Sequence, residues 1–362
     1  MKEKIKERIK RLAEETAKAG ADAFAVINDE SSNWQNLYYL SGFRGTSGAL
    51  LVRASGEAEL LLDGRYIEQG HEQSPLPVRP LENNLTQDVT DLIKKIGAKE
   101  ILCEAYATTH KIWTSLENNG GIWRDGASIT ETMRRTKDEK ETALIKKAAE
   151  LGAKAFLETL GATKAGMTEK AFAALLDYNI TIAGGEPGFE MIVASGPRSV
   201  MPHGRASERE MRSGEWVTVD FGARAGGYFC DITRNFCIGG TSAEAEEMHE
   251  LLKKAHKEAA EMLRPGINGK EVHGRAVEIL EEAGAAQYFT HSLGHGFGLD
   301  IHEAPLLSGR RDDILKAGDI VTIEPGLYIP DFGGMRLEDD YLITETGAER
   351  LTKELNQTFY RV

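Results

Sequence analysis

The stretch VTVDFGARAGGYFCDITRNF, residues 217–236, predicts a β-hairpin that carries two aspartates on one face. Its side chains alternate on both sides of Gly226-Gly227, as is typical of two strands joined by a glycine turn. A register centred between Ala225 and Gly226 sets Asp220 directly across from Asp231. Directly opposed Cβ atoms lie roughly 4.5–5.5 Å apart, and like charges there destabilise a sheet. A shared proton, a nearby arginine or a metal ion is therefore expected to neutralise this pair.

A second acidic pair follows from the stretch IVTIEPGLYIPDFGGMRLEDDYLIT, which predicts a hairpin at 319–345 centred on Asp331. The symmetric register sets Glu324 across from Glu338. The second register is less well defined than the first, because its loop is long and contains Pro330, whereas the first hairpin turns at a pair of glycines. An acidic pair on a solvated strand face is the ordinary alternative for either hairpin, but two pairs in equivalent places favour a functional site.

The order of elements around the two hairpins repeats. Two predicted helices, a strand and a hairpin follow one another twice, about 105 residues apart, although the residues themselves differ. The first set comprises helices at 139–162 and 168–183 and a strand at 189–194. The second comprises helices at 242–263 and 269–283 and a strand-like segment at 288–300. The pattern predicts an α+β domain with an internal duplication.

Two domains are expected, at residues 1–132 and 133–362, because the chain is long enough for both. The first has the apolar runs and helical segments of an α/β domain. A charged joint without strands, RRTKDEKE at 134–141, precedes the second. Thr136 and Glu139 have the spacing of a capping box that would begin a helix, as have Thr241 and Glu244.

Composition limits the classes of partner. A net charge of −13 disfavours nucleic acid and anionic membranes as partners. No apolar run approaches the ~18 residues of a membrane span, and the N-terminal residues lack the apolar core of a signal peptide. The three cysteines, Cys103, Cys230 and Cys237, fit a reducing cytoplasm. A zinc site at Cys230 and Cys237 is the weaker alternative to two small buried side chains, because their spacing is not that of a zinc knuckle.

Three histidines lie between the hairpins in HSLGHGFGLDIHEAP: His291, His295 and His302. One imidazole added to four carboxylates makes a site rich in oxygen ligands, which suits manganese, cobalt or iron. Four carboxylates exceed the needs of one ion, so two ions about 3.5–4 Å apart are expected. The other helical histidines, His249, His256 and His273, lie on charged helices and are expected on solvated faces.

These residues resemble the pita-bread metallopeptidases, which include methionine aminopeptidase, prolidase and aminopeptidase P. The resemblance rests on DFGARAGGYFCD, GHGFGLDIHE, TIEPG and MRLED. It implies the pita-bread fold and five metal ligands, namely Asp220, Asp231, His295, Glu324 and Glu338. It further implies that Asp220 binds one ion, that His295 and Glu324 bind the other, and that Asp231 and Glu338 bridge both.

The resemblance also implies roles in catalysis and substrate binding. Glu324 would carry protons between the nucleophile and the leaving nitrogen, and His302 would stabilise the tetrahedral intermediate or hold the peptide. His203 corresponds to a substrate-binding histidine, and His291 to one that lines the pocket for the residue after the cleaved bond. Arg336 would orient the bridging carboxylates.

Within the family, the first domain and Arg336 favour the Xaa-Pro peptidases. The stretches NLYYLSGFRGTSGALLV and LLLDGRYIEQ resemble the N-terminal domain of prolidases, aminopeptidases P and creatinase. The expected function is cleavage of Xaa-Pro bonds in short proline-containing peptides by a homodimer with two ions per chain, manganese first and cobalt second. The alternatives are a methionine or broader aminopeptidase, creatinase, and an inactive module that binds peptides or protein partners.

Overall fold

The computed structural model describes residues 2–126 and 128–362 and divides into two compact units, Met1–Arg134 and Arg135–Val362. This division falls two residues after the expected boundary. Each unit has a hydrophobic core of its own.

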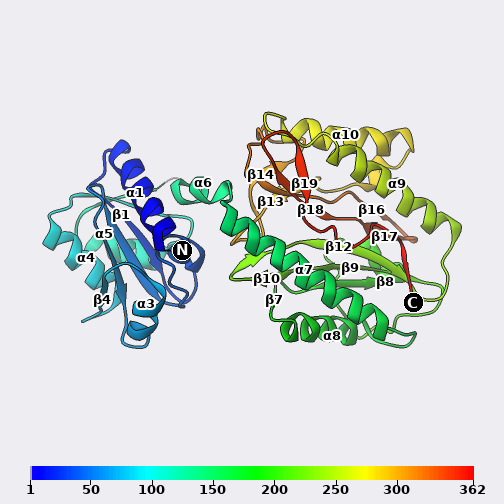
Figure 1. Ribbon diagram of the computed structural model, residues 1–362, viewed down its shortest axis with the longest axis horizontal. Coiled ribbons are helices and arrows are strands. Elements are labelled where there is room, and N and C mark those ends of the chain that lie inside the picture. The colour runs from blue at the N-terminus through cyan, green and yellow to red at the C-terminus, as the bar shows by residue number, and fades with distance from the viewer. Residues whose placement is uncertain (1, 127) are drawn as a thin grey trace. The chain divides into compact units, whose positions relative to one another are not determined.

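The first unit is one six-stranded sheet with helices packed on it (Figure 1). Its strands, in sheet order, are β4 (Val78–Pro80), β3 (Ala58–Leu62), β2 (Gly48–Arg53), β1 (Ala23–Asn28), β5 (Glu100–Cys103) and β6 (Ile122–Asp125). Its helices are α1 (Lys2–Lys18), α2 (Trp34–Ser41), α3 (Ile67–Gln73), α4 (Leu85–Ile96), α5 (His110–Asn118) and α6 (Ile129–Arg135). Strand β1 is buried along its whole length, as expected for a continuous apolar run in the middle of a covered sheet.

The second unit contains the expected duplication. Its helices are α7 (Glu139–Ala162), α8 (Glu169–Ile182), α9 (Ala243–Ala260) and α10 (Gly269–Glu282), with short 3-10 turns η1 (Gly196–Val200) and η2 (Ala286–Tyr288). The first repeat has strands β7 (Glu186–Pro187), β8 (Ile192–Ser195), β9 (Trp216–Phe221), β10 (Ala223–Ala225), β11 (Tyr228–Phe229) and β12 (Ile232–Cys237). The second has β13 (Gly294–Gly296), β14 (Glu303–Leu307), β15 (Ile320–Ile323), β16 (Gly326–Ile329), β17 (Gly333–Arg336), β18 (Asp339–Ile343) and β19 (Ala348–Arg350), and β20 (Tyr360–Arg361) ends the chain.

The helices cover the strands in pairs. Helix α7 packs against α8, and α9 packs against α10. Figure 1 shows the first pair on one side of the strands of this unit and the second pair on the other. Apolar side chains of α7 and α8 form a core with β8, β9 and β12, while α9 and α10 pack on strands of the second repeat. The two hairpins therefore lie between the helix pairs.

The register of the first hairpin differs from the predicted one by two residues. Asp220 pairs with Thr233, and Ala225 pairs with Tyr228. The turn is formed by Gly226 and Gly227, whose φ values of 56° and 88° are accessible mainly to glycine. Asp231 is therefore diagonal to Asp220 and on the same face, because the side chains of a strand alternate.

The register of the second hairpin is the predicted one. Ile323 pairs with Asp339, and Gly326 pairs with Arg336. Glu324 and Glu338 lie between these pairs, where the Leu337 N–H donates to the Pro325 carbonyl (3.1 Å). The two glutamates thus stand across from each other, at the break between the β15–β18 and β16–β17 ladders.

Several local predictions need correction. Helix α7 begins at an Asp138–Glu141 capping box and not at Thr136, which instead forms an isolated bridge with Asp319. Helix α9 is capped by Ser242, one residue after Thr241. The predicted strand at 288–300 is extended only at Gly294–Gly296.

The helical histidines are also placed differently from the prediction. His249 and His256 are buried, and His273 is half-buried against Phe289. The apolar and small residues around them on α9 and α10 pack on the sheet, so these histidines lie toward the core. All three cysteines are buried and free, which confirms the prediction of small buried side chains.

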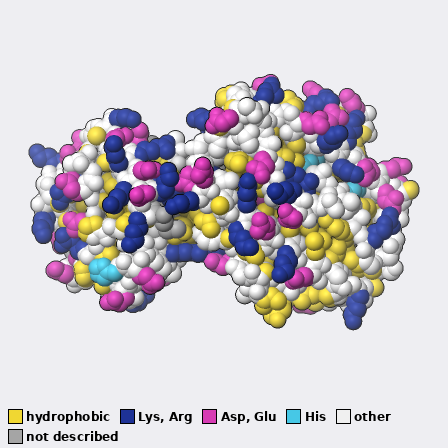
Figure 2. Space-filling view, viewed as in Figure 1, with side chains coloured by type: hydrophobic (Ala, Val, Ile, Leu, Met, Phe, Trp, Pro, Cys, Tyr) yellow, Lys and Arg dark blue, Asp and Glu magenta, His cyan; other side chains and the backbone are white. Residues whose placement is uncertain are grey.

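On the face shown in Figure 2, Lys and Arg side chains are interspersed with Asp and Glu, without an extended basic patch. None of the described helices combines the length and hydropathy needed to cross a bilayer.

Candidate metal and substrate site

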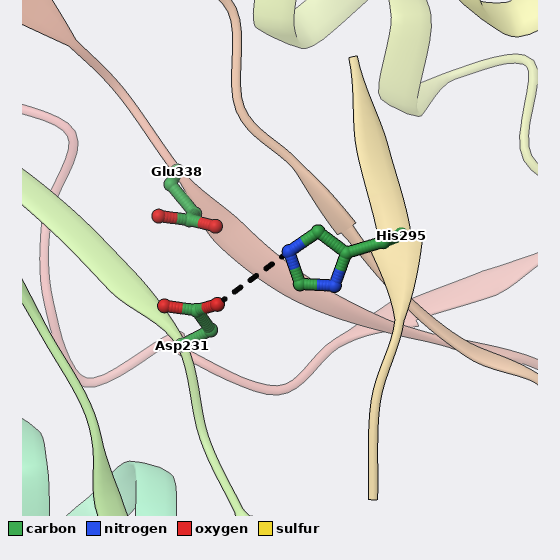
Figure 3. A group of neighbouring side chains, drawn as sticks. All are labelled: Asp231, His295 and Glu338. Atoms are coloured by element: carbon green, nitrogen blue, oxygen red, sulfur yellow. Dashed lines mark ion pairs between the residues drawn. The ribbon is translucent and has the colours of Figure 1, made fainter. Parts of the chain in front are cut away.

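Asp231, His295 and Glu338 come together in the interior of the second unit. One potential ligand atom from each lies within 4.8 Å of those of the other two. Figure 3 shows the two carboxylates and the imidazole pointing toward one another from three separate segments. His295 Nε2 is 3.7 Å from Asp231 Oδ2. All three residues are buried.

The glycines around His295 allow its strand to approach its neighbours closely. A Cβ on Gly294 would lie 2.0 Å from the Thr322 carbonyl oxygen, and one on Gly296 would lie 2.4 Å from the Ala304 carbonyl oxygen. The β13–β14 register shifts between His295 and Gly296, as in a β-bulge. These contacts explain why the histidine stands between two glycines.

Glu324 and Asp220 complete the acidic cluster. Glu324 Oε1 lies 3.4 Å from His295 Nε2 and accepts a weak hydrogen bond from Thr322 Oγ1 (3.4 Å). Asp220 Oδ2 accepts a hydrogen bond from Arg336 Nη2 (2.6 Å), and its charge raises the pKa of Asp231 and of Glu338. All five predicted ligands are therefore in one cluster.

The charges in this cluster oppose one another. Burial, followed by the charge of Glu338, raises the pKa of Asp231 well above its ordinary value, and the same two causes act on Glu324. Burial and the charge of Asp220 raise the pKa of Glu338 to about 8. Without cations, the cluster would retain protons that isolated carboxyl groups lose at neutral pH.

His295 is uncharged in this environment. Burial, followed by the charge of His302, lowers its pKa to about 3. Its Nδ1 lies 3.1 Å from the Gly296 carbonyl, which leaves Nε2 facing the carboxylates. A neutral imidazole with one nitrogen fixed by a backbone carbonyl is the form that binds metal ions.

The other predicted histidines lie around the cluster. The His302 ring is 4.4 Å from the His295 ring, and its side chain is exposed. His291 Nε2 lies 3.2 Å from the Tyr328 hydroxyl, and burial lowers the pKa of His291 to about 4. His203 is exposed, and its charge contributes to lowering the pKa of both His291 and His302.

Arg336 contacts the acidic cluster both directly and through a hydroxyl group. Its guanidinium bonds directly to Asp220, and not to the carboxylates expected to bridge. It reaches Glu338 only through Thr233, which accepts from Arg336 Nε (3.0 Å) and donates to Glu338 Oε2 (2.6 Å). Arg336 Nη1 also donates to the Tyr328 hydroxyl (2.7 Å).

Sequence reasoning missed the polar residues that support the cluster: Thr233, Thr322, Tyr328 and Asp340. Asp340 Oδ2 accepts the Asp231 N–H (3.1 Å), and Thr322 Oγ1 accepts the His295 N–H (3.1 Å). The available signal was strand alternation, which places Thr233 on the face of Asp231 and Thr322 on that of Glu324.

A buried ion pair lies directly behind Glu338. Arg234 Nη2 donates to Asp339 Oδ1 (2.6 Å), and Arg234 Nη1 donates to the Glu338 carbonyl (2.6 Å). His256 Nε2 is 3.3 Å from Asp339 Oδ2. Burial alone would raise the pKa of Asp339, but Arg234 and His256 lower it to about 2. This pair ties the two hairpins together beside the cluster.

The cluster fits divalent cations. Asp220 Oδ1 is buried and has no hydrogen-bond partner among the described residues. Four carboxylates, three of them with raised pKa values, and a neutral imidazole form an oxygen-rich donor set of the kind that binds hard or borderline ions. Cations would neutralise the repulsion that otherwise keeps protons in the cluster.

Comparison with known proteins gives concordant results. Residues 143–345 match metallopeptidase family M24, and residues 8–136 match the creatinase/prolidase N-terminal domain. A protein named Xaa-Pro dipeptidase from Pyrococcus horikoshii is 34% identical over 351 residues, which is 96% of this chain and 97% of the relative.

Solved structures agree over the whole chain. The structure of an Xaa-Pro dipeptidase from Bacillus anthracis superposes with a TM-score of 0.94 at 32% sequence identity. The superposition covers 99% of this chain and 100% of the dipeptidase chain. The structure of an X-Pro aminopeptidase from Thermotoga maritima superposes with a TM-score of 0.91 at 34% sequence identity. The superposition covers 95% of this chain and 98% of the aminopeptidase chain. The predicted architecture, a creatinase/prolidase-type N-terminal domain followed by a pita-bread domain, is thereby confirmed. Through the match across most of its second unit and the identity to a full-length relative, the chain belongs to metallopeptidase family M24.

Proposed function

We propose that this chain is a metal-dependent peptidase that hydrolyses Xaa-Pro bonds in short peptides. The observation that carries the proposal is the buried group of Asp231, Glu338 and the neutral His295, with the half-buried Glu324 and Asp220 beside it. The substrate class is supported by the relatives, since proteins named for Xaa-Pro cleavage match this chain along nearly its full length.

We infer that Asp220, Asp231, His295, Glu324 and Glu338 hold two divalent ions, with manganese as the first candidate and cobalt as the second. Such ions supply Lewis acidity toward the scissile carbonyl and activate water as the nucleophile at neutral pH. This inference is supported by the distances from His295 Nε2 to one carboxylate of each hairpin, 3.7 Å to Asp231 and 3.4 Å to Glu324.

The surrounding residues would orient the peptide and move protons. Glu324 lies beside His295, with Thr322 on its Oε1, and is suited to pass a proton to the leaving nitrogen. His302 and His203 are exposed near the cluster and could bond the substrate carbonyl. Arg336 donates hydrogen bonds to Asp220 and to the Tyr328 hydroxyl and would keep both side chains in place.

We infer that the proline ring of the substrate binds beside His291. Its nitrogen has no N–H after the bond forms, and its ring restricts the backbone, so recognition must come from contacts to the ring. The Phe289 ring lies edge-on to His291, with centroids 5.0 Å apart, and the Tyr328 ring also contacts His291, with centroids 5.6 Å apart. These aromatic edges are suited to contact with a proline ring.

A homodimer and a cytoplasmic location remain part of the proposal. The three free buried cysteines are compatible with a reducing compartment.

The test uses the full chain, stripped with a chelator and then loaded with manganese or cobalt. Rates of proline release from Xaa-Pro dipeptides and of Xaa release from Xaa-Pro-Yaa tripeptides are compared with those on a methionyl-alanyl peptide. Preference for either proline series supports the proposal, and the better of the two series defines the peptide length. Loaded protein that cleaves neither series contradicts it.

A further inference from the structure

The turn between β13 and β14 joins His295 to His302, and an acidic side chain fills it. Glu303 pairs across the ladder with Gly296, so it closes the turn directly after His302. Glu303 Oε1 accepts the backbone N–H groups of Leu299 (3.1 Å) and Asp300 (3.0 Å). One carboxylate oxygen thus fixes the backbone between the two histidines.

The other oxygen of Glu303 binds a lysine from a distant part of the chain. Lys137 Nζ donates to Glu303 Oε2 (3.0 Å) and to the Arg135 carbonyl (3.0 Å), and the lysine side chain is only 1% exposed. The Lys137 N–H donates to the Gly318 carbonyl (2.8 Å), which anchors its backbone. A buried ammonium held in this way has few alternative positions, so it can act as a rigid support.

Gly298, inside the turn, lies directly against the Lys137 and Glu303 side chains. A Cβ on Gly298 would lie 2.8 Å from Lys137 Cε and 3.1 and 3.2 Å from the two Glu303 oxygens. Phe297 and Leu299 are buried, and the Gly298 carbonyl accepts the Phe229 N–H (2.9 Å). His302 is exposed at the end of this turn.

We propose that Lys137 and Glu303 are a positioning pair that sets His302 relative to His295 for the reaction. The side-chain hydrogen bonds of the pair go to the turn and to the Arg135 carbonyl and not to the proposed metal ligands, so the pair acts through the turn. This inference rests on the proposed function, since it assigns the pair to the step in which His302 contacts the peptide. A displacement of about 1 Å in such a group can cost about a hundredfold in rate.

The experiment compares K137M and E303Q with R135M in the full chain. Arg135 lies in the same segment and bonds Asp319 through two nitrogens (3.0 and 2.7 Å), away from the turn, so R135M controls for the loss of a buried ion pair. We expect K137M and E303Q to lower kcat about ten- to hundredfold with little change in KM or metal content. R135M should lower the melting temperature and leave kcat close to that of the wild type.

A double-mutant cycle with His302 identifies the route of action. If Lys137 acts through His302, K137M will cause no further loss of kcat in an H302A background, because the group that it positions is gone. Amide exchange at Leu299 and Asp300 should also quicken in E303Q, a readout that does not depend on activity.

The positioning role alone would be overturned by wild-type kcat in K137M, or by equal losses of kcat from K137M with and without His302. Unchanged amide exchange in E303Q would do the same. A metal-loaded wild type that is inactive on all Xaa-Pro peptides would instead contradict the proposed function together with this role.

Discussion

Replacing Asp231 with asparagine keeps the shape of the side chain and removes one charge from the centre of the cluster. The Asp231 backbone N–H would still donate to Asp340, so the fold should be retained. We expect metal content to fall and activity to drop at least about a hundredfold, because Asp231 is the ligand proposed to bridge the two ions. Elemental analysis after dialysis and a circular dichroism spectrum provide the measurement. Two ions per chain with full activity in D231N would contradict the assigned bridge.

Replacing Arg336 with lysine tests its support of Asp220. Lysine keeps the charge but cannot bond Asp220, Thr233 and Tyr328 at once, as the guanidinium does. We expect kcat/KM to fall about ten- to hundredfold, the usual cost of losing a group that orients a metal ligand. Steady-state kinetics at saturating metal measure this effect. Wild-type kinetics in R336K would show that a positive charge alone is enough to support Asp220.

At the scale of single residues, sequence identified the acidic cluster and His295 because charge and glycine spacing mark them. It did not identify Thr233, Thr322 or Asp340, since a hydroxyl or carboxyl group that supports a neighbour has no pattern of its own. His256 was misplaced for a related reason: the many charged residues of α9 obscured the face that packs on the sheet.

At the scale of elements, the start of helix α7 offers a direct comparison of two caps. Asp138 accepts the N–H groups of Lys140 and Glu141, and the Glu141 carboxylate accepts the Asp138 N–H. D138A should lower the free energy of unfolding by about 1 kcal/mol, as is usual for an N-cap. T136A should lower it less, because Thr136 lies outside the box. Urea denaturation of both variants measures the difference. A larger loss of unfolding free energy in T136A than in D138A would support Thr136 as the cap, as predicted from the sequence.

The two hairpins show what fixes a register. The first was predicted with its centre one residue too early, between Ala225 and Gly226. Because a hairpin is symmetric, that error moved every pair by two residues, yet it kept both aspartates on one face. The second was centred correctly on Asp331, whose positive φ of 62° marks the loop. The position of the residues with positive φ decides the pairing, and sequence indicates that position only to within a residue.

At the scale of the whole molecule, the cluster makes stability depend on pH when metal is absent. Burial raises the pKa of Glu338 from 4.5 to about 8. Its neutral form therefore stabilises the fold below pH 4.5, and that contribution is lost as the pH rises to about 8. Between pH 6.5 and 9, chelator-treated protein should lose stability as the pH rises, and E338Q should lose less. The measurement is urea denaturation of the chelator-treated wild type and E338Q at pH 6.5 and at pH 9, with manganese-loaded protein as the control. Equal losses in wild type and E338Q would contradict this account.

The charged segment that precedes α7 also determines how the second unit could be studied alone. The family match starts at residue 143, beyond Lys137 and the Asp138 cap. A fragment trimmed to that match would lack the ammonium that Glu303 binds and the first turn of its longest helix. A fragment beginning at Arg135 would retain both, together with the Arg135–Asp319 bond. Residues 135–142, which the match to family M24 leaves out, would thus separate an intact catalytic unit from one with a loosened histidine turn.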